Sequence, residues 1–164
     1  MKLQEKLKIC TMAIDKKKYN AIKFDFEKNL IVSTNGNILL KINHVFDKDN
    51  SALLEPENQK SIIFHAIYLE ELNKHLDLSH NLFQVLQQHL GVYQYSNYFP
   101  DVDRISFYNT QSVNNISYNT KTLLSVIKIC EKLTMQNIEF NFNDVKNPTQ
   151  IKNDIAEIIF MPKI

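Results

Sequence analysis

Glycine and proline are scarce in this sequence, and tryptophan is absent. Its 164 residues include two glycines and four prolines, with 44% hydrophobic and 23% charged residues. This composition is typical of an ordered globular chain, because flexible linkers and low-complexity segments are rich in glycine, proline or polar repeats. The sequence also contains no phosphate loop, dinucleotide fingerprint or nucleophile elbow, all of which need glycines at fixed positions. We therefore expect a protein that is not an enzyme.

Cysteine is equally rare, and the histidines follow no metal-binding spacing. Cys10 and Cys130 lie far apart on the apolar faces of predicted helices, so we expect free, buried thiols in a reducing cytoplasm rather than a disulfide. The five histidines and two cysteines form none of the close pairs that zinc sites use. Asp101 and Asp103 offer paired carboxylates, but a Pro-Asp turn is commoner and no third ligand is near. We expect no metal and no other cofactor.

Long apolar runs and a strong net charge are also absent. No stretch approaches the ~20 apolar residues of a membrane helix, and the N-terminal residues do not open a signal-peptide run. The formal net charge is +1, which is too small to indicate nucleic-acid binding by the chain as a whole. We expect a cytoplasmic protein without a membrane partner, in which any DNA contact depends on where individual lysines lie.

The sequence does contain clear hydrophobic periodicities in its first sixty residues. Apolar residues at three- and four-residue spacing predict a helix from Leu3 that ends near residues 15–18. Strict alternation predicts a strand over 21–26, and further strands are expected at 30–32 and 38–45. Asn35-Gly36 between the last two is a strong hairpin signal, because both residues tolerate a positive φ.

The pattern of strand and helix then recurs twice. The second copy is predicted as a strand at 61–64, a helix around 68–76 and two strands at 82–86 and 92–95. The third is predicted as a strand at 115–118, a helix at 120–133 capped by Asn119 or Thr120, and strands at 138–142, 150–152 and 155–161. The expected fold class is α+β, with three strand-helix-strand units whose helices pack on one face of antiparallel sheets.

Three segments occur in the order in which one known family carries them. They are Ser-Thr-Asn-Gly-Asn-Ile-Leu at 33–39, Tyr-Phe-Pro-Asp-Val-Asp-Arg-Ile at 98–105 and Phe-Met-Pro at 160–162. They resemble the Ala-Thr-Asp-Gly-His-Arg-Leu hairpin, the Tyr-Pro-Asp-Tyr segment and the terminal Met-Pro motif of the bacterial DNA polymerase III beta sliding clamp family. The predicted helix at 122–127 resembles that family's Tyr-Leu-Leu-Asp-Val-Leu helix. The resemblance implies a DNA-clamp-like fold.

The resemblance also implies a domain organisation. In the family, two units form one domain and twelve units encircle duplex DNA. Residues 1–110 are then expected to form a clamp-like domain of two units, and residues 111–164 a third unit similar to the second half of a clamp domain. We expect a homo-oligomer; four chains of three units would supply twelve, while a monomer or a dimer without a hole stays open.

A second implication is a hydrophobic pocket that receives short peptide motifs of DNA polymerases and other clamp-binding proteins. By motif match, its residues are Thr34, Gly36, Asn37, Leu39, Ile159, Met161 and Pro162. The alternative is that Leu39 and Ile159 are ordinary core and that Met161-Pro162 only ends a strand. Asn37 and Ile38 replace the usual His and Arg, so either the specificity differs or the pocket is lost.

Lysines on two predicted helices are the candidates for contact with double-stranded DNA. They are Lys2, Lys6, Lys121, Lys128 and Lys132, spaced so that each set shares one helix face opposite the apolar residues. Such lysines would attract phosphates without reading sequence, which suits a sliding protein. The alternative is a plain solvated face, since Glu5 and Glu131 interrupt both stripes.

The leading hypothesis is therefore a clamp-like accessory protein of DNA replication, that is, a processivity factor. The sequence is rich in Lys, Asn and Ile, which suits the AT-rich genome of a phage or another mobile element. An interaction module or clamp mimic that keeps only the peptide pocket is the first alternative. An unrelated α+β enzyme using Asp101, Asp103 or the histidines is the second. Tyr93, Tyr95, Tyr98 and Phe99 could also stack single-stranded bases, although alternating aromatics usually pack within a sheet.

Overall fold

The computed structural model describes residues 1–47, 54–78, 81–93, 99–104, 116–142 and 147–163. Within these residues its helices are α1 (Leu3–Cys10), α2 (Leu69–Asp77), α3 (Leu82–Tyr93) and α4 (Thr120–Lys132). The strands are β1 (Ala21–Asp25), β2 (Leu30–Thr34), β3 (Ile38–Asn43), β4 (Ser61–His65), β5 (Phe140–Asn141), β6 (Thr149–Lys152) and β7 (Ala156–Phe160). Short 3-10 turns include η1 (Thr11–Ala13) and η5 (Val102–Arg104).

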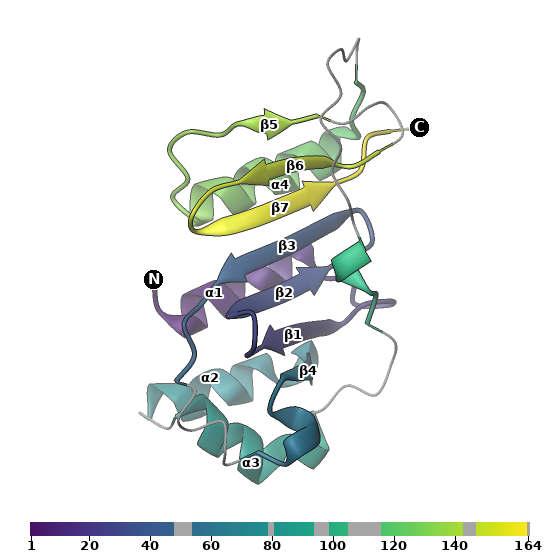
Figure 1. The fold of residues 1–164 in the computed structure, drawn as a ribbon. Helices are drawn as coiled ribbons and strands as arrows, with labels where there is room; N and C mark the ends of the chain where they lie inside the picture. Colours follow the sequence, from purple (N-terminus) through teal and green to yellow (C-terminus); the bar gives the residue numbers. More distant parts are fainter. Residues whose placement is uncertain (48–53, 79–80, 94–98, 105–115, 143–146, 164) are drawn as a thin grey trace.

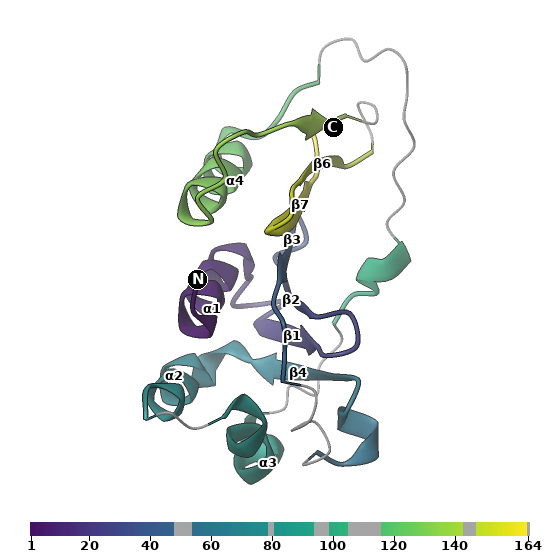
Figure 2. The ribbon, with the colours of Figure 1, turned by 60° about the vertical axis from the view of Figure 1, so that its left-hand side comes forward.

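All seven strands form one antiparallel sheet in the order β4-β1-β2-β3-β7-β6-β5 (Figure 1). Figure 2 shows α1, α2 and α4 along one face of this sheet, with α3 next to α2 beyond the β4 edge. The expected α+β class, with helices on one face of an antiparallel sheet, is confirmed. The opposite face, which we call the outer face, carries no α-helix among the described residues.

Two parts of the fold repeat the same order of one helix and three strands. These units are α1-β1-β2-β3 and α4-β5-β6-β7. Their last strands, β3 and β7, pair antiparallel with Leu40 opposite Ile158. Because antiparallel pairing of equivalent strands relates them by a two-fold rotation, the units are related by an approximate two-fold axis through that pair. We call the β3–β7 pair the seam.

The hairpins of the two units show how closely the repeat holds. In the β2–β3 turn, the Asn35 side-chain oxygen accepts hydrogen bonds from the N–H groups of Asn37 and Ile38. In the β6–β7 turn, the Asn153 oxygen does the same for Ile155 and Ala156. The helices share a short sequence as well, Leu-Lys-Ile-Cys at 7–10 and Ile-Lys-Ile-Cys at 127–130. The repeat is therefore one of local sequence as well as of pattern.

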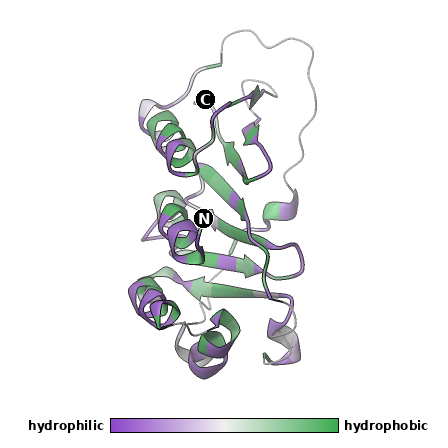
Figure 3. Cartoon of the chain, turned by 90° about the vertical axis from the view of Figure 1, so that its left-hand side faces the viewer, coloured by the Kyte–Doolittle hydropathy of each residue, from purple (hydrophilic) through white to green (hydrophobic). Residues whose placement is uncertain are grey.

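The main core lies between the helices and the sheet. Alternate residues of β3, namely Ile38, Leu40 and Ile42, point into it and are almost fully buried. Cys10 and Cys130 are buried there as free thiols, as expected, and burial raises the pKa of Cys10 to about 12. In Figure 3 hydrophobic residues dominate the strands, while hydrophilic residues colour much of the helices. Each buried Leu or Ile contributes roughly 1.5–3 kcal/mol to folding, so this layer stabilises the chain.

A second, smaller cluster lies on the outer face. It contains Val32, Leu39, Ile159 and Val102, each at most 7% exposed. The first three come from β2, β3 and β7, and Val102 comes from η5, far away in the sequence. Alternation along β3 explains the arrangement, because Leu39 faces away from its neighbours Ile38 and Leu40.

The predicted strands at 82–86 and 92–95 are wrong. Residues 82–93 form helix α3, while residues 94 and 95 lie outside the described residues. The Asn81 side chain accepts from the Phe83 N–H, and Gln84 accepts in return from the Asn81 N–H. This reciprocal capping starts the helix. The second unit is thus strand-helix-helix, which corrects the expectation of three strand-helix-strand units.

The third unit also differs from its prediction at the start. Residues 116–118 have no regular structure, so the expected strand at 115–118 is wrong for the part that is described. Helix α4 is confirmed, and Asn119 is its cap, since its side-chain oxygen accepts from the Lys121 N–H. The strand expected at 138–142 is shorter, spanning Phe140–Asn141. The division into 1–110 and 111–164 stays a prediction; β3 and β7 join these segments in one sheet.

Candidate functional site

A pocket of about 200 Å³ lies at one end of the seam. Six of the seven residues assigned to a pocket by motif line it: Thr34, Gly36, Asn37, Leu39, Ile159 and Met161. Pro162 is buried directly after them and does not line the pocket. Segments more than 100 residues apart in the sequence thus meet here because β3 pairs with β7.

The β2–β3 hairpin forms one wall. The Thr34 hydroxyl donates to the Ile38 carbonyl and accepts from the Gly36 N–H, at 2.8 and 3.1 Å. Gly36 has a φ of +87°, in the region that side chains disfavour, and Tyr19 lies 3.4 Å from the point where a Cβ would be. The turn therefore requires glycine, and its backbone stays close to the pocket.

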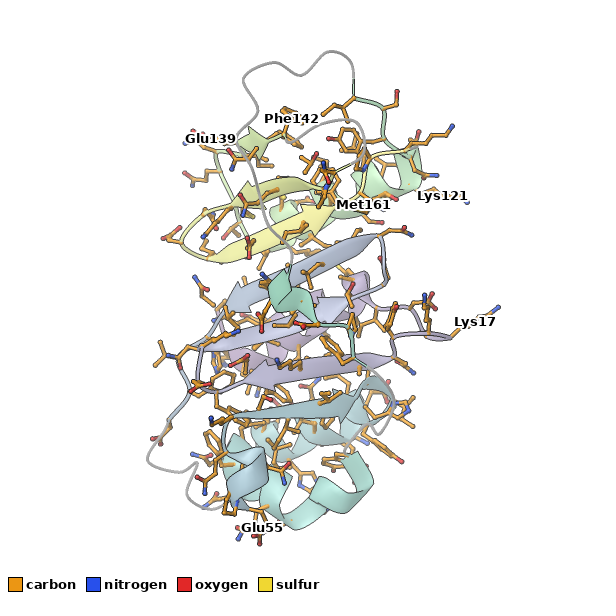
Figure 4. The ribbon with its side chains drawn as sticks, turned by 45° about the vertical axis from the view of Figure 1, so that its right-hand side comes forward. Lys17, Glu55, Lys121, Glu139, Phe142 and Met161 are labelled. Carbon is orange, nitrogen blue, oxygen red and sulfur yellow. The ribbon has the colours of Figure 1, made fainter. Side chains whose placement is uncertain are left out.

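Strand β7 and the residues after it form the floor and the second wall. Leu39 pairs with Ile159 across the seam, and both side chains are nearly fully buried on the outer face. The Met161 N–H donates to the Asn37 carbonyl at 3.0 Å, so the chain after β7 stays attached to the hairpin. Figure 4 shows Met161 at this end of the seam, above the β2–β3 hairpin. Its flexible thioether makes an adaptable wall.

The third wall is a segment that we call the strap, residues 99–104. Pro100, Asp101 and Val102 line the pocket, and η5 lies across β2 and β3 on the outer face (Figures 1 and 2). Val102 packs on Val32, Leu39 and Ile159.

A surface ion pair holds the strap to the β1–β2 turn. Lys28 and Asp103 lie 2.7 Å apart, and both side chains are about half exposed. Hydrogen bonding to the Lys28 ammonium lowers the pKa of Asp103, and the same bond raises the pKa of Lys28. Because solvent screens such pairs, this one contributes little to stability.

One of the five lysines assigned to DNA is not on an exposed helix face. Lys2, Lys121, Lys128 and Lys132 are exposed on the helix layer, and Figure 4 shows Lys121 pointing away from α4. Lys6 is half-buried instead; its ammonium donates to the Asn43 carbonyl at 2.6 Å and lies 3.3 Å from His44 Nδ1. Burial lowers the pKa of Lys6. Lys6 thus fastens α1 to the end of β3 and does not extend the exposed row.

The exposed face of α4 is also not purely basic. Leu124 and Ile127 are 54% and 41% exposed between the lysines, and Glu131 is exposed as well. A surface made only to follow a phosphate backbone would not need these apolar residues. The face fits protein contact as well as DNA contact.

The remaining sequence candidates have other roles in the fold. Asp103 is in the ion pair with Lys28, and the Asp101 oxygen accepts from the Asp103 N–H. Tyr93 is fully buried, so its proposed stacking on bases is contradicted. Phe99 is half-buried against the outer cluster, and Tyr95 and Tyr98 lie outside the described residues. Among the described residues, no three His, Cys, Asp or Glu are grouped as metal ligands, and no helix is long and apolar enough to span a bilayer.

Comparison with known proteins gives a likeness in fold. No protein-family model and no curated protein matches the chain. Among solved structures, the chain is similar to the β subunit of DNA polymerase III from Thermotoga maritima, with a TM-score of 0.60 and 12% identity. The match covers 99% of this chain and 63% of that protein. At this identity the likeness shows the fold alone, and the chain is clamp-like in fold.

Sequence reasoning missed several residues of the pocket, with Tyr19 and the strap among them. Tyr19 lines it, but its position before β1 carries no motif. The strap was noticed for its Tyr-Phe-Pro-Asp pattern, yet its contact with the outer face depends on tertiary packing. A hint was available, because Val102 is an apolar residue between two aspartates in a Pro-Asp turn, where a solvated loop would be polar throughout.

Proposed function

We propose that this protein is a non-enzymatic, clamp-like accessory protein of DNA replication that binds short apolar segments of polymerases or other replication proteins. The observation that carries the proposal is the pocket over the Leu39–Ile159 pair, which six motif residues line. The clamp-like fold supports the same setting. A replication role of this kind belongs in the cytoplasm.

The size and chemistry of the pocket suit a peptide side chain. Pockets for drug-sized ligands measure about 300–1,000 Å³, and this one is smaller at about 200 Å³. An apolar floor with an adaptable methionine wall accepts one or two apolar side chains. The N–H groups of Gly36 and Asn37 beside it already bond Thr34 and Asn35, so the pocket offers side-chain contacts rather than backbone donors.

A double substitution at the pocket floor tests the pocket. On the outer face of the seam, Leu39–Ile159 and Lys41–Glu157 are cross-strand pairs on either side of the two-fold axis. Leu39→Lys with Ile159→Glu places in the pocket a cross-strand ion pair with its lysine on β3 and its glutamate on β7, as in Lys41–Glu157. We expect binding of a polymerase clamp-binding peptide, measured by fluorescence anisotropy, to fall at least about tenfold, because a buried floor becomes charged.

The matched control is Lys41→Glu with Glu157→Lys. It exchanges the charges of the existing pair, whose ammonium and carboxylate lie 2.9 Å apart, and leaves the pocket unchanged. Peptide binding should stay within about twofold of the wild-type value. Equal binding by the wild type and by the Leu39→Lys, Ile159→Glu variant would remove the pocket from consideration.

Encirclement of double-stranded DNA by a homo-oligomer is the second candidate. The exposed Lys2, Lys121, Lys128 and Lys132 on the helix layer support it. Light scattering at micromolar concentration gives the oligomeric state, and salt-resistant retention on circular but not linear DNA would indicate a closed ring, because rings slide off free ends. A monomer excludes encirclement and leaves the role of an interaction module or clamp mimic.

A further inference from the structure

Three consecutive lysines, Lys16, Lys17 and Lys18, form a tight turn before β1. Asp15 and Tyr19 form an isolated antiparallel bridge, and the Tyr19 N–H donates to the Asp15 carbonyl at 2.9 Å. The Asp15 side chain accepts from the Lys17 N–H at 2.8 Å. All three lysines are exposed, and Figure 4 shows Lys17 pointing into solvent. The turn is thus a fixed loop that presents positive charge.

Tyr19 joins this turn to the pocket. Its ring lines the pocket and lies against Gly36, the glycine of the β2–β3 turn. The Lys18 ammonium lies 4.9 Å from the centre of the same ring, within the range of a cation–π contact. One aromatic side chain therefore has the pocket on one side and a lysine beside it, so a ligand that fills the pocket ends close to the lysines.

Two carboxylates, Asp15 in the lysine turn and Asp101 in the strap, offset part of this charge. Asp15 and Asp101 both use a side-chain oxygen to accept a backbone N–H, within the lysine turn and within the strap respectively. Their orientation is therefore set by the loops to which they belong. The lysine ammonium groups sit at the ends of long side chains and can reach toward a ligand.

We propose that the lysine turn recognises acidic residues adjacent to the apolar anchor of a partner peptide. The inference rests on the proposed function and deepens it, since it names the chemistry of the partner: an apolar anchor with aspartates or glutamates beside it. A peptide explains the juxtaposition better than DNA does, because the turn lies at the rim of an apolar pocket and a phosphate backbone has no use for that pocket. Complementary charge at a rim raises specificity and the association rate.

The experiment compares two forms of one peptide on the intact protein. A polymerase clamp-binding peptide with a neutral fluorophore is extended by three aspartates at either end, and matched peptides carry three asparagines. At ~50 mM salt we expect the better aspartate peptide to bind about 3- to 30-fold more tightly, the sum of three exposed charge contacts. The advantage should shrink at ~500 mM salt, where the Debye length is a few ångströms.

Variants assign the effect to the turn. Lys16→Gln, Lys17→Gln and Lys18→Gln together should bring the aspartate peptide to within about twofold of the asparagine peptide. The pair Lys16→Gln and Lys17→Gln, which keeps Lys18 on Tyr19, should remove most of the advantage without disturbing the pocket wall. Lys121→Gln, Lys128→Gln and Lys132→Gln remove the same charge from α4 and should leave the advantage intact.

Each other outcome counts against the proposal in a distinct way. Equal binding of both peptides to the wild type overturns the lysine inference and leaves the pocket standing. If the wild type binds neither peptide, the proposed function is overturned, and the inference with it. If the variant with Lys16, Lys17 and Lys18 all changed to Gln loses retention on double-stranded DNA but keeps the aspartate advantage, the turn binds nucleic acid instead.

Discussion

The two ends of the seam share one backbone and carry different side chains. At the first end, which we call the open end, Met161 donates its N–H to Asn37, and Leu39 pairs with Ile159 under the strap. At the closed end, Asn43 donates its N–H to Ile155 in the equivalent position. The approximate two-fold axis through Leu40 and Ile158 exchanges these ends. The same backbone geometry can therefore be compared with two different sets of side chains.

Hydrogen bonds and an ion pair between polar residues hold the closed end together. The Asn43 side chain donates to the Asp154 carbonyl at 2.6 Å, in the hairpin turn where the open end has Gly36. Lys6 bonds the Asn43 carbonyl, and Lys41 faces Glu157, which also accepts from Gln150. Burial opposes ionisation of Glu157, but Lys41 and Gln150 outweigh it and lower its pKa.

The open end has Met161-Pro162 where the closed end has Asn43-His44. Neither a thioether nor a proline ring can donate a hydrogen bond to the turn opposite, so the Gly36 hairpin is not tied in this way. The comparison teaches that a pocket here needs no special backbone. Two apolar residues in place of two polar ones, with an apolar cross-strand pair in place of an ion pair, distinguish the open end with its pocket from the closed end.

The largest expected effect is the loss of stability caused by a substitution at the two-fold axis, between the two ends of the seam. Leu40 is fully buried at the axis, where both units contribute to the core. Leu40→Ala should lower the free energy of unfolding by about 2–5 kcal/mol through lost burial and a cavity. Urea denaturation measures this, with exposed Asn37→Ala as a control; a loss below about 1 kcal/mol would show that the axis is not central to stability.

The next prediction concerns the pH dependence of stability, to which the closed end should contribute and the open end should not. At the closed end, burial and the charge of Lys6 lower the pKa of His44 to about 4, from about 6.5 in an unfolded chain. Between these values the unfolded chain binds more protons, so this contribution is complete above pH 6.5 and is lost as the pH falls toward 4. We expect a loss of about 1–2 kcal/mol between pH 7 and 5, moderated by partial exposure.

The His44 effect is isolated by subtraction. His44→Asn should flatten the difference in stability between pH 7 and 5, while the equivalent change at the open end, Pro162→Ala, should leave it in place. Thermal or urea denaturation of the wild type and of both variants at the two pH values measures these differences. An unchanged pH dependence in His44→Asn would mean that other groups dominate the titration.

The two hairpin turns give a smaller contrast. Gly36 has a φ of +87°, whereas the equivalent Asp154 is not among the positive-φ residues of the described chain. Gly36→Ala should therefore cost about 1–2 kcal/mol, and Asp154→Ala less than about 0.5 kcal/mol. Denaturant midpoints of the two variants decide; equal losses would contradict the assigned turn geometry.

The smallest effect concerns the strap. Asp103→Asn removes the exposed ion pair with Lys28 and should change global stability by less than about 0.5 kcal/mol. Since the pKa of Asp103 is lowered, the pair contributes above the ordinary carboxyl pKa and is lost as the pH falls through the lowered value. Val102 methyl signals in NMR spectra should report looser packing of the strap. Unaltered signals would show that Val102 alone fixes it.

The sequence was informative where local chemistry decides structure. Alternation and the Asn-Gly turn predicted β1 to β3, and the period of α4 with its Asn119 cap predicted that helix. The region after α2 was mistaken for strands because it contains a dense apolar run. Over so short a window, Leu82, Phe83, Val85 and Leu86 fit the period of a strand as well as that of a helix. The Asn81–Gln84 capping pair was the signal that favours a helix.

Tertiary pairing was beyond local patterns. Motif resemblance brought Leu39 and Ile159 into one predicted pocket, and the structure places them opposite each other. That Lys6 turns toward β3 while Lys2 stays exposed could not be foreseen, since both share a helical spacing with Glu5 between them. The strap's position depends on Val102 finding a small apolar cluster, which no periodicity encodes.

The seam also sets an order of events in folding. Leu40 and Ile158 are about 120 residues apart, so their pairing closes a long loop whose entropy must be overcome before the contacts form. Each unit can form its own hairpins first, whereas the pocket floor exists only once the units meet. We expect peptide-binding competence to appear with the slowest refolding phase seen by stopped-flow methods; earlier appearance would refute this order. Binding would then report that both halves of the chain have found each other.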